Sequence, residues 1–515
     1  MVFKRCFFVN RCFENYPILY SIDNEGKNAI RTFIILRNKF LLCNENRLMP
    51  NKMRLQSFGA AQQVTGSKHL IITNKGKKIL LDCGLFQGIN TSDLNLNFGF
   101  NPSEIDYLLV SHAHIDHTGL IPRLVKKGFS GPIFCTAATQ SLCEIMLMDS
   151  ARIQERDLER VNKRRRNRNE EELELLYEEE DVNNALELFQ IIQLNKSFYL
   201  EDGVKVEYFN AGHILGSAGI LLTFEDENNK KLYFTGDIGR PNDKILKSPS
   251  DFPQVDYLIC ESTYGDRLHE PELDMKASLL RIVHNTCVVK RGKLIIPAFA
   301  VDRTQELIFA LDQLENEGML PKIPVYVDSP LAVNATMIMK KHREDFNPEI
   351  LQYIEREGDA FGFDNLHYIT EVNDSKALNE SKVPCIIISA SGMAEAGRIK
   401  HHIANNIQNS KNTILIVGYC SPNSLGHAIK SGQKTVRVFG EEKAVIADVE
   451  VMDSLSAHAD YSEMIALLKC QDASKVKKMF LVHGEFETQL AFKEKLKKEG
   501  FKNILIPAQG EIFEL

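Results

Sequence analysis

Short apolar runs separated by turn-forming residues dominate the chain from Met53 to about residue 265. Residues 68–72 and 78–81 flank the turn-forming cluster Asn74-Lys75-Gly76, and this arrangement predicts a β-hairpin. Further short strands are expected at residues 107–110, 204–209, 219–224, 232–235 and 257–260. Because each of these runs ends in polar residues, the pattern predicts a layered, sheet-rich domain with a site at its strand ends.

The pattern changes between about residues 274 and 440, where apolar strands alternate with amphipathic helices. Strands are expected at residues 293–296, 324–327, 384–389 and 413–417, and helices at residues 304–317, 335–343 and 398–407. Such alternation predicts parallel βαβ units. After residue 443 the chain returns to strand, helix, strand and helix, so the middle segment is interpreted as an insertion into the first domain.

Residues 152–190 are predicted to be helical and strongly charged. The basic run Lys163-Arg164-Arg165-Arg166 precedes two acidic runs, at residues 170–172 and 178–181. Charge runs of this kind are usually solvated helix faces, and this interpretation is favoured. Contact between the four basic residues and RNA is the second interpretation.

Composition limits the classes of protein that fit. The chain has 515 residues, of which 44% are hydrophobic and 25% charged, which suits a globular protein of two or three domains. Its formal net charge of -7 offers no overall attraction to a polyanion, so a nucleic-acid site would have to be a local cleft. No apolar run approaches the roughly 20 residues that cross a bilayer, which argues against a membrane role.

The eleven cysteines lie scattered without a CxxC pair. This distribution does not resemble a secreted disulfide framework, and it favours reduced thiols and a cytoplasmic location. Residues 1–52 hold nine Lys or Arg against four Asp or Glu and show little periodicity. They are interpreted as an extension outside the fold that comes from a misplaced start codon, with a basic arm that touches nucleic acid as the second interpretation.

The strongest chemical signal follows directly after the predicted strand at residues 107–110. Three imidazoles and one carboxylate stand within six positions, as His112, His114, Asp116 and His117. Imidazole and carboxylate groups are the ligands that zinc takes at catalytic sites. In a loop, alternate residues can face one metal while the next two turn toward a second, so the cluster predicts a metal site rather than unrelated surface histidines.

This HxHxDH motif resembles the signature of the metallo-β-lactamase fold, whose other motifs follow in order. Residues 80–84 hold Asp82, residues 211–213 end in His213, and residues 234–237 end in Asp237. The resemblance spans nearly all of the chain after Met53. It implies an α/β protein with an αββα metallo-β-lactamase sandwich. It also implies that Asp82 orients a metal ligand or the bound water without binding the metal itself.

The family resemblance assigns two zinc ions to this site. It implies that His112, His114 and His213 hold one ion, that Asp116 and His117 help to hold the other, and that Asp237 bridges the two. Two divalent ions about 3.5 to 4 Å apart need such a carboxylate against their mutual repulsion, and they can activate a shared water molecule.

The inserted segment resembles the β-CASP branch of this fold, a group of nucleic-acid nucleases. Three segments carry this resemblance, at residues 261–265, 456–460 and 482–484. They imply that His483 completes the second zinc site and that His458, paired with Glu261, is the general acid. Histidine rather than valine at position 483 is associated, within the family, with RNA substrates.

The implied domain order is an N-terminal extension, a metallo-β-lactamase domain in two parts and an inserted parallel-sheet β-CASP domain. The boundaries expected for these parts are residues 1–52 for the extension, 53–265 and 443–515 for the metallo-β-lactamase domain, and 266–442 for the insertion.

Other stretches look closest to bacterial relatives of the pre-mRNA 3′-end-processing endonuclease. They imply substrate contacts from Arg303, Ser391, Gly392 and Arg398. A Ser-Gly turn that enters a helix exposes backbone N–H groups suited to a phosphate, although glycine and arginine can also simply cap and solvate the helix. Asp302 and residues 420–427 depart from the family pattern, which puts substrate preference in doubt but leaves the metal chemistry intact.

The expected function is that of a zinc-dependent ribonuclease which cleaves single-stranded RNA, endonucleolytically and with 5′ exonucleolytic action as a second mode. A DNA nuclease or a small-ester hydrolase on the same dizinc site is the first alternative. An inactive RNA-binding scaffold is the second. The sequence leaves the oligomeric state open, with a homodimer as one option.

Overall fold

The structure is a computed structural model that describes residues 52–88, 91–269, 275–418, 420–421, 424–452 and 456–515. The chain separates into two units, Met1–Lys52 and Met53–Leu515. The predictions for residues 1–51 lie outside the described residues, and the account below concerns the second unit. Within the described ranges, no helix is both long enough and apolar enough to cross a membrane.

A seven-stranded sheet opens the fold. The predicted hairpin is present as antiparallel strands β2 and β3, and β3 to β6 run parallel. The strands in spatial order are β22 (Ile512–Glu514), β1 (Arg54–Gly59), β2 (Lys68–Ile72), β3 (Lys78–Leu81), β4 (Tyr107–Leu109), β5 (Ile133–Thr136) and β6 (Phe189–Ile192). The last strand of the chain therefore pairs with the first described one.

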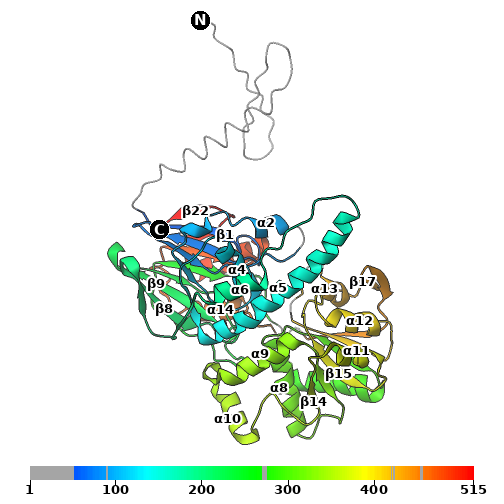
Figure 1. The fold of residues 1–515 in the computed structure, drawn as a ribbon. Coiled ribbons are helices and arrows are strands. Elements are labelled where there is room, and N and C mark those ends of the chain that lie inside the picture. Colours follow the sequence, from blue (N-terminus) through cyan, green and yellow to red (C-terminus); the bar gives the residue numbers. More distant parts are fainter. Residues whose placement is uncertain (1–51, 89–90, 270–274, 419, 422–423, 453–455) are drawn as a thin grey trace, which may run out of the picture. The chain divides into compact units, whose positions relative to one another are not determined.

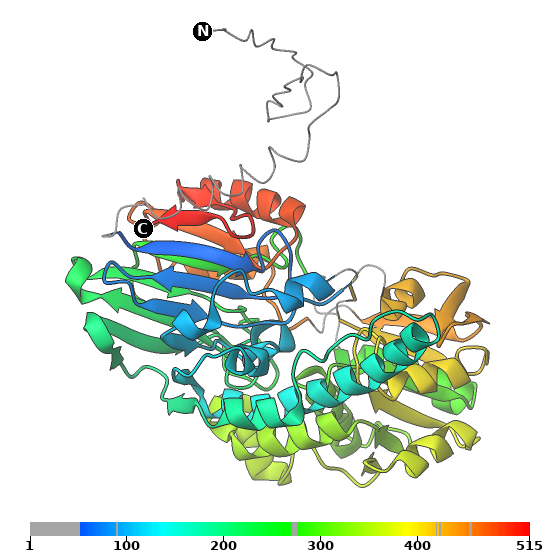
Figure 2. The ribbon, with the colours of Figure 1, turned by 45° about the horizontal axis from the view of Figure 1, so that its top comes forward.

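A second seven-stranded sheet packs against the first (Figures 1 and 2). Its strands in spatial order are β21 (Ile504–Leu505), β20 (Lys478–Val482), β11 (Tyr257–Glu261), β10 (Lys230–Phe234), β9 (Ala218–Phe224), β8 (Val204–Asn210) and β7 (Phe198–Leu200). Alternate side chains point inward from each sheet. Leu55 and Ile71 of the first sheet and Ile220 and Phe480 of the second belong to one buried core.

Helices cover the outer faces of both sheets. Residues of α4 (Ile121–Lys126), α5 (Ala137–Arg166) and α6 (Glu179–Leu186) join a core with β3 and β4. Residues of α14 (Tyr461–Leu468) and α15 (Phe486–Lys498) pack on the second sheet. Two short helices, α2 (Ser92–Leu96) and α3 (Ile115–Thr118), lie in the loops after β3 and β4. The predicted αββα sandwich is confirmed.

The insertion forms a six-stranded sheet in which each neighbouring pair is parallel. Its strands in spatial order are β14 (Leu366–Tyr368), β13 (Val325–Val327), β15 (Cys385–Ser389), β12 (Lys293–Pro297), β16 (Thr413–Val417) and β19 (Asp448–Met452). The parallel sheet predicted for the insertion is confirmed. Because β19 pairs with β16, the sheet of the insertion includes residues up to Met452, and the boundary at residue 442 stays a prediction.

Seven α-helices connect the strands of the insertion within its described part. They are α7 (Met275–Val283), α8 (Arg303–Asn316), α9 (Pro330–Lys341), α10 (Pro348–Glu357), α11 (Val372–Glu380), α12 (Ile399–Asn406) and α13 (Leu425–Lys430). A hairpin of β17 (Thr435–Val438) and β18 (Glu441–Ala444) follows α13. The insertion meets the sandwich where α9 lies along α5 (Figure 1).

The charged segment at residues 152–190 is only partly helical, unlike the prediction. Helix α5 ends at Arg166, and the chain turns at Asn169, which has a positive φ of 52°. Arg165 then pairs with Glu170 at 3.3 Å, and Arg166 pairs with Glu172 at 2.7 Å. Since the acidic run folds back onto part of the basic run, these charges support the solvated-face interpretation.

Candidate metal centre

Strand register brings the polar strand ends to one edge of the sandwich. Leu81 pairs with Leu109 across β3 and β4, and Glu261 pairs with Val482 across β11 and β20. Because these strands are parallel, the residues that follow their carboxyl ends meet at the same edge. The segments that begin at Asp82, Val110 and His483 therefore converge although they are far apart in the sequence.

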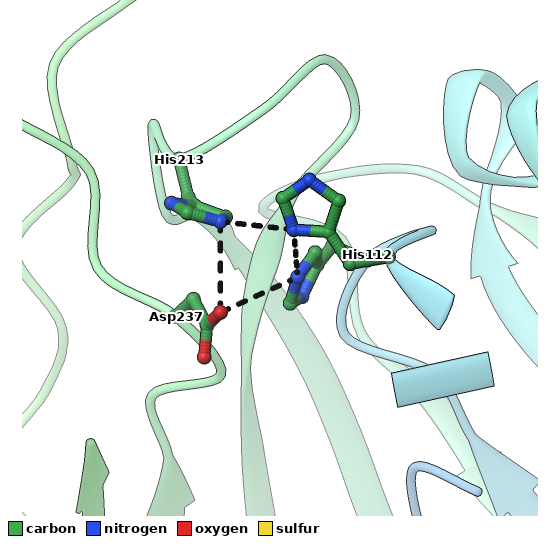
Figure 3. A group of neighbouring side chains, drawn as sticks. His112, His213 and Asp237 are labelled. Carbon is green, nitrogen blue, oxygen red and sulfur yellow. Dashed lines mark hydrogen bonds and ion pairs between the residues drawn. The ribbon is translucent and has the colours of Figure 1, made fainter. Parts of the chain in front are cut away.

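The first group of converging side chains contains three histidines and one aspartate: His112, His114, His213 and Asp237. His114 Nδ1 lies 3.1 Å from His112 Nε2 and 3.2 Å from His213 Nε2. Asp237 Oδ2 lies 3.5 Å from the Nε2 atoms of His112 and His213. Figure 3 shows His112, His213 and Asp237 pointing toward one another.

The second group lies on the other side of the same carboxylate and contains Asp116, His117 and His483. The Nε2 atoms of His117 and His483 are 3.1 Å apart, and His483 Nε2 lies 3.4 Å from Asp116 Oδ2. Asp237 Oδ1 is 3.3 Å from His117 Nε2 and 3.6 Å from His483 Nε2. One oxygen of Asp237 thus faces each group.

These residues fit a pair of metal ions. Asp237 Oδ1 is buried and has no hydrogen-bond partner among the described residues, and such an orphaned oxygen is costly unless something else binds it. Burial lowers the pKa of His114 to about 4 and holds the pKa values of His112 and His213 well below the usual range. The first three imidazoles are therefore neutral at pH 7, as metal ligands must be.

Two outer contacts orient histidines of the second group. Asp82 Oδ2 accepts a hydrogen bond from His117 Nδ1 at 2.7 Å, and Asp82 Oδ1 accepts one from the Ser111 backbone N–H at 2.8 Å. Thr263 Oγ1 lies 2.9 Å from His483 Nδ1. In both histidines a partner at Nδ1 leaves the Nε2 lone pair directed into the site, which is how ligand tautomers are commonly selected.

A histidine and a glutamate lie beside the first group. His458 Nδ1 is 3.1 Å from Glu261 Oε1, and His458 Nε2 is 4.0 Å from Asp237 Oδ2. Burial lowers the pKa of His458, but the charge and hydrogen bond of Glu261 outweigh burial and raise the pKa to about 9. His458 therefore carries a proton at neutral pH, with Nε2 on the side of the metal-binding groups.

Comparison with known proteins decides the family. Residues 69–274 match the metallo-β-lactamase superfamily, residues 304–429 the β-CASP domain, and residues 442–507 the zinc-dependent metallo-hydrolase RNA specificity domain. Ribonuclease TTHA0252 from Thermus thermophilus is 33% identical over 448 residues, which cover 87% of this chain and 97% of that protein. The chain belongs to the β-CASP ribonuclease family of the metallo-β-lactamase superfamily.

Two archaeal proteins are also similar to this chain over most of its length. An RNase J-like protein from Methanocaldococcus jannaschii is 29% identical over 90% of this chain and 99% of its own length. The transcription termination factor FttA of the same organism is 30% identical over 88% of this chain and 70% of its own length. The chain thus spans nearly all of the first of these relatives, and the predicted family is confirmed.

The substrate residues predicted from the β-CASP resemblance belong to the inserted domain, and two of them have ionic partners there. Arg303 is only 4% exposed and is ion-paired with Asp302 at 2.7 Å and with Glu306. Arg398 Nη1 donates to Asp328 Oδ1 at 2.6 Å, and Arg398 Nη2 donates to the Thr370 carbonyl. Both guanidinium groups are thus already bound within the protein, which argues against direct contact with a phosphate.

Ser391 and Gly392 lie in the loop that leads into α12. Ser391 Oγ accepts hydrogen bonds from the backbone N–H groups of Glu395 and Ala396, at 3.2 and 3.4 Å. A Cβ atom at Gly392 would lie 2.6 Å from the Phe299 ring. Glycine is therefore required here by packing, and a phosphate contact from this loop stays a prediction.

Two supporting residues were not assigned roles from the sequence. Thr263, which stands two positions after Glu261, orients His483. His269 donates from Nε2 to the His458 carbonyl at 2.9 Å, and its backbone N–H donates to Asp460 Oδ2 at 3.0 Å. A threonine within the recognised motif offered a signal for the first role, but nothing in the sequence pairs His269 with a residue 189 positions away.

Proposed function

We propose that this chain is a zinc-dependent phosphodiesterase that cleaves single-stranded RNA, mainly by endonucleolytic cuts and with 5′ exonucleolytic action as a second mode. The observation that supports this most directly is the position of Asp237. Its two oxygens face two separate groups of imidazoles, and the proton-bearing His458 lies 4.0 Å from one of them.

The residues that would hold the two ions follow from the two groups. His112, His114 and His213 would bind one zinc ion, Asp116, His117 and His483 would bind the other, and Asp237 would bind both. When bound, a pair of zinc ions activates water for attack on phosphorus and offsets negative charge on the phosphate. Asp237 would reduce the repulsion between two such cations.

His458 is suited to the second half of the reaction. Cleavage of a phosphodiester between the 3′ oxygen and phosphorus leaves an alkoxide that must gain a proton, and His458 Nε2 can donate it. Glu261 holds the imidazole by Nδ1 and keeps it protonated. The products are then a 3′ hydroxyl on one fragment and a 5′ phosphate on the other, and no 2′ hydroxyl is needed as a nucleophile.

Family relationships support RNA as the substrate. The relatives that span nearly the whole chain are a ribonuclease and an RNase J-like protein. His483 stands at the position where histidine implies RNA within the family. We also retain a cytoplasmic location and a homodimer as predictions, and sedimentation of the purified protein tests the second of these.

Assays on matched substrates test the proposed function. Purified protein should cleave single-stranded RNA faster than DNA of the same sequence and faster than thioester or lactam substrates. Fragments from one internally labelled RNA should carry 5′ phosphate and 3′ hydroxyl ends. Faster DNA or ester hydrolysis would favour the corresponding alternative, and an inactive protein with a full metal complement would indicate an RNA-binding scaffold.

A further inference from the structure

An aromatic residue is exposed at the tip of the β17–β18 hairpin. Phe439 and Gly440 form the two-residue loop, with φ angles of 54° and 87°, and Phe439 is 51% exposed. Loops with two positive φ angles favour Asn, Asp or Gly at the first position, and a bulky side chain there is an outlier. Turn formation does not explain Phe439, and about half of its surface stays exposed, which makes it a candidate for a functional role.

Two residues of α12, one aromatic and one cationic, contact this ring. The His401 ring lies 4.5 Å from the Phe439 ring, centroid to centroid, at an interplanar angle of 35°. Lys400 Nζ lies 5.5 Å from the Phe439 centroid. Burial and then nearby positive charges, including those of His402, Arg160 and Lys400, lower the pKa of His401. Arg160 belongs to α5, so the charge of a sandwich residue also acts on His401.

A pocket opens beside the hairpin. It has a volume of about 530 Å³, and Lys400 and Arg437 supply its positive charges. Neither residue makes an ion pair within the described part of the chain. Two acids also line the pocket: Glu395, whose carboxylate accepts from the Leu425 backbone N–H, and Glu442, which lies opposite Arg437 in the hairpin.

The pocket also connects with the loop that precedes α12. Glu395 lines the pocket, and its backbone N–H donates to Ser391 Oγ at 3.2 Å. Helix α12, strand β17 and helix α13 are neighbours on the same side of the inserted domain (Figure 1). Lys400 thus contacts the exposed ring and also lines the pocket, and Glu395 links the pocket to the Ser391 loop.

We propose that Phe439 is a stacking platform for a base of single-stranded RNA, and that Lys400 and Arg437 bind the adjoining phosphates. This inference rests on the proposed ribonuclease function and places a second RNA contact outside the metal centre. Exposed aromatic rings combined with cations bind single strands without sequence preference, because every base has a flat face. An RNA strand that is long enough to extend from the metal centre to Phe439 would be bound at both places.

Phe439→Asn gives a sharp test, because asparagine favours this turn and should leave the hairpin folded. We expect its KM for a long oligouridylate to rise about tenfold, as loss of one stacked base predicts. The kcat for that RNA, and hydrolysis of bis-p-nitrophenyl phosphate, should not change. Phe439→Tyr should behave like the unaltered chain. Tyr199→Ala, which removes an exposed aromatic ring from the sandwich, is the matched control and should have no effect.

Photocrosslinking tests the contact without relying on cleavage. Oligouridylate that carries 5-iodouridine should crosslink to the peptide containing Phe439, and Lys400→Ala with Arg437→Ala should weaken that crosslink. An unchanged KM in Phe439→Asn would overturn the proposal that Phe439 stacks on an RNA base. Crosslinks found only in peptides without Phe439 would also overturn it. Failure of the unaltered chain to cleave RNA would instead overturn the proposed function, while the crosslink would still decide whether Phe439 contacts RNA.

Discussion

Two clusters of polar residues lie at the ends of parallel strands, and they differ in how their lone pairs are used. At the edge of the sandwich, imidazole nitrogens face one another at 3.1 and 3.2 Å, and Asp237 Oδ1 lacks a hydrogen bond among the described residues. In the insertion, Asp328 follows β13, and both of its carboxylate oxygens have partners. It accepts from Ser375 and Arg398 and contacts His402 Nε2 at 2.6 Å.

The difference separates a ligand site from a structural network. Buried polar groups are normally satisfied, so a cluster that satisfies itself needs no ligand. A cluster of acceptor atoms that converge on one another is stabilised when a cation lies between them. By this criterion Asp237 is suited to a metal centre, whereas Asp328 and Arg398 form a network whose partners lie within the protein.

Loss of a metal ligand should have the largest effect. The unaltered chain should bind about two zinc ions, since seven ligand residues exceed what one tetrahedral ion can use. Asp237→Ala and His483→Ala should lose metal and hydrolyse neither RNA nor bis-p-nitrophenyl phosphate at a useful rate. Metal analysis and both assays on protein of unchanged circular dichroism check this. Two ions retained in either variant would remove Asp237 or His483 from the ligand set.

Loss of the proton donor should come next. His458→Ala should keep both ions but cleave RNA about 10² to 10⁴ times more slowly, the usual cost of losing a general acid. Because p-nitrophenolate leaves without a proton, hydrolysis of bis-p-nitrophenyl phosphate should fall much less. Equal losses on both substrates, or loss of zinc, would contradict the assignment.

Asp82→Asn should weaken metal binding and leave proton donation by His458 unchanged. The amide oxygen can still accept from His117 Nδ1, but it no longer carries the charge that makes His117 a stronger ligand. Zinc affinity should fall about 10- to 100-fold, as it does when outer partners of ligands are lost. Titration with a competing chelator measures this, and excess zinc should restore activity. Activity that stays low at saturating zinc would show a direct catalytic role.

Glu261→Gln should have a milder effect, visible mainly in the pH profile. Glu261 raises the pKa of His458, so removal of its charge lowers that pKa. The protonated acid is present below its pKa and is lost as pH rises, so the alkaline limb of RNA cleavage should move to lower pH. The limb for bis-p-nitrophenyl phosphate should stay in place, and a shift of both limbs would point to the metal centre instead.

Arg398→Ala should change the kinetics of RNA cleavage least. This variant tests whether the Asp328 network stabilises the insertion rather than binding substrate. It removes a partner of the buried Asp328 carboxylate, so the free energy of unfolding should fall by about 3 kcal/mol. The KM for RNA should change little at a temperature where the variant is folded. Urea titration and cleavage assays measure the two effects. A large rise in KM without loss of stability would restore Arg398 to the substrate site.

Much of the fold could be predicted because its signals are local. Apolar runs bounded by turn residues predicted β2 and β3 at their observed bounds, and alternation predicted the parallel sheet of the insertion. Pairing between distant segments was harder to anticipate. The contact of β22 with β1 and the inclusion of β19 in the inserted sheet depend on neighbours that no local pattern identifies.

The sequence by itself determined the chemistry of the metal centre, since imidazoles and carboxylates at strand ends offer the same ligand atoms in any arrangement that brings them together. Only the tertiary structure decided that each oxygen of Asp237 faces a different group. It also decided that Arg303 and Arg398 are held in ion pairs and that Phe439 is exposed. The physical reason is that an arginine or a phenylalanine is equally suited to a core, an ion pair or a ligand contact, and distant neighbours choose among them.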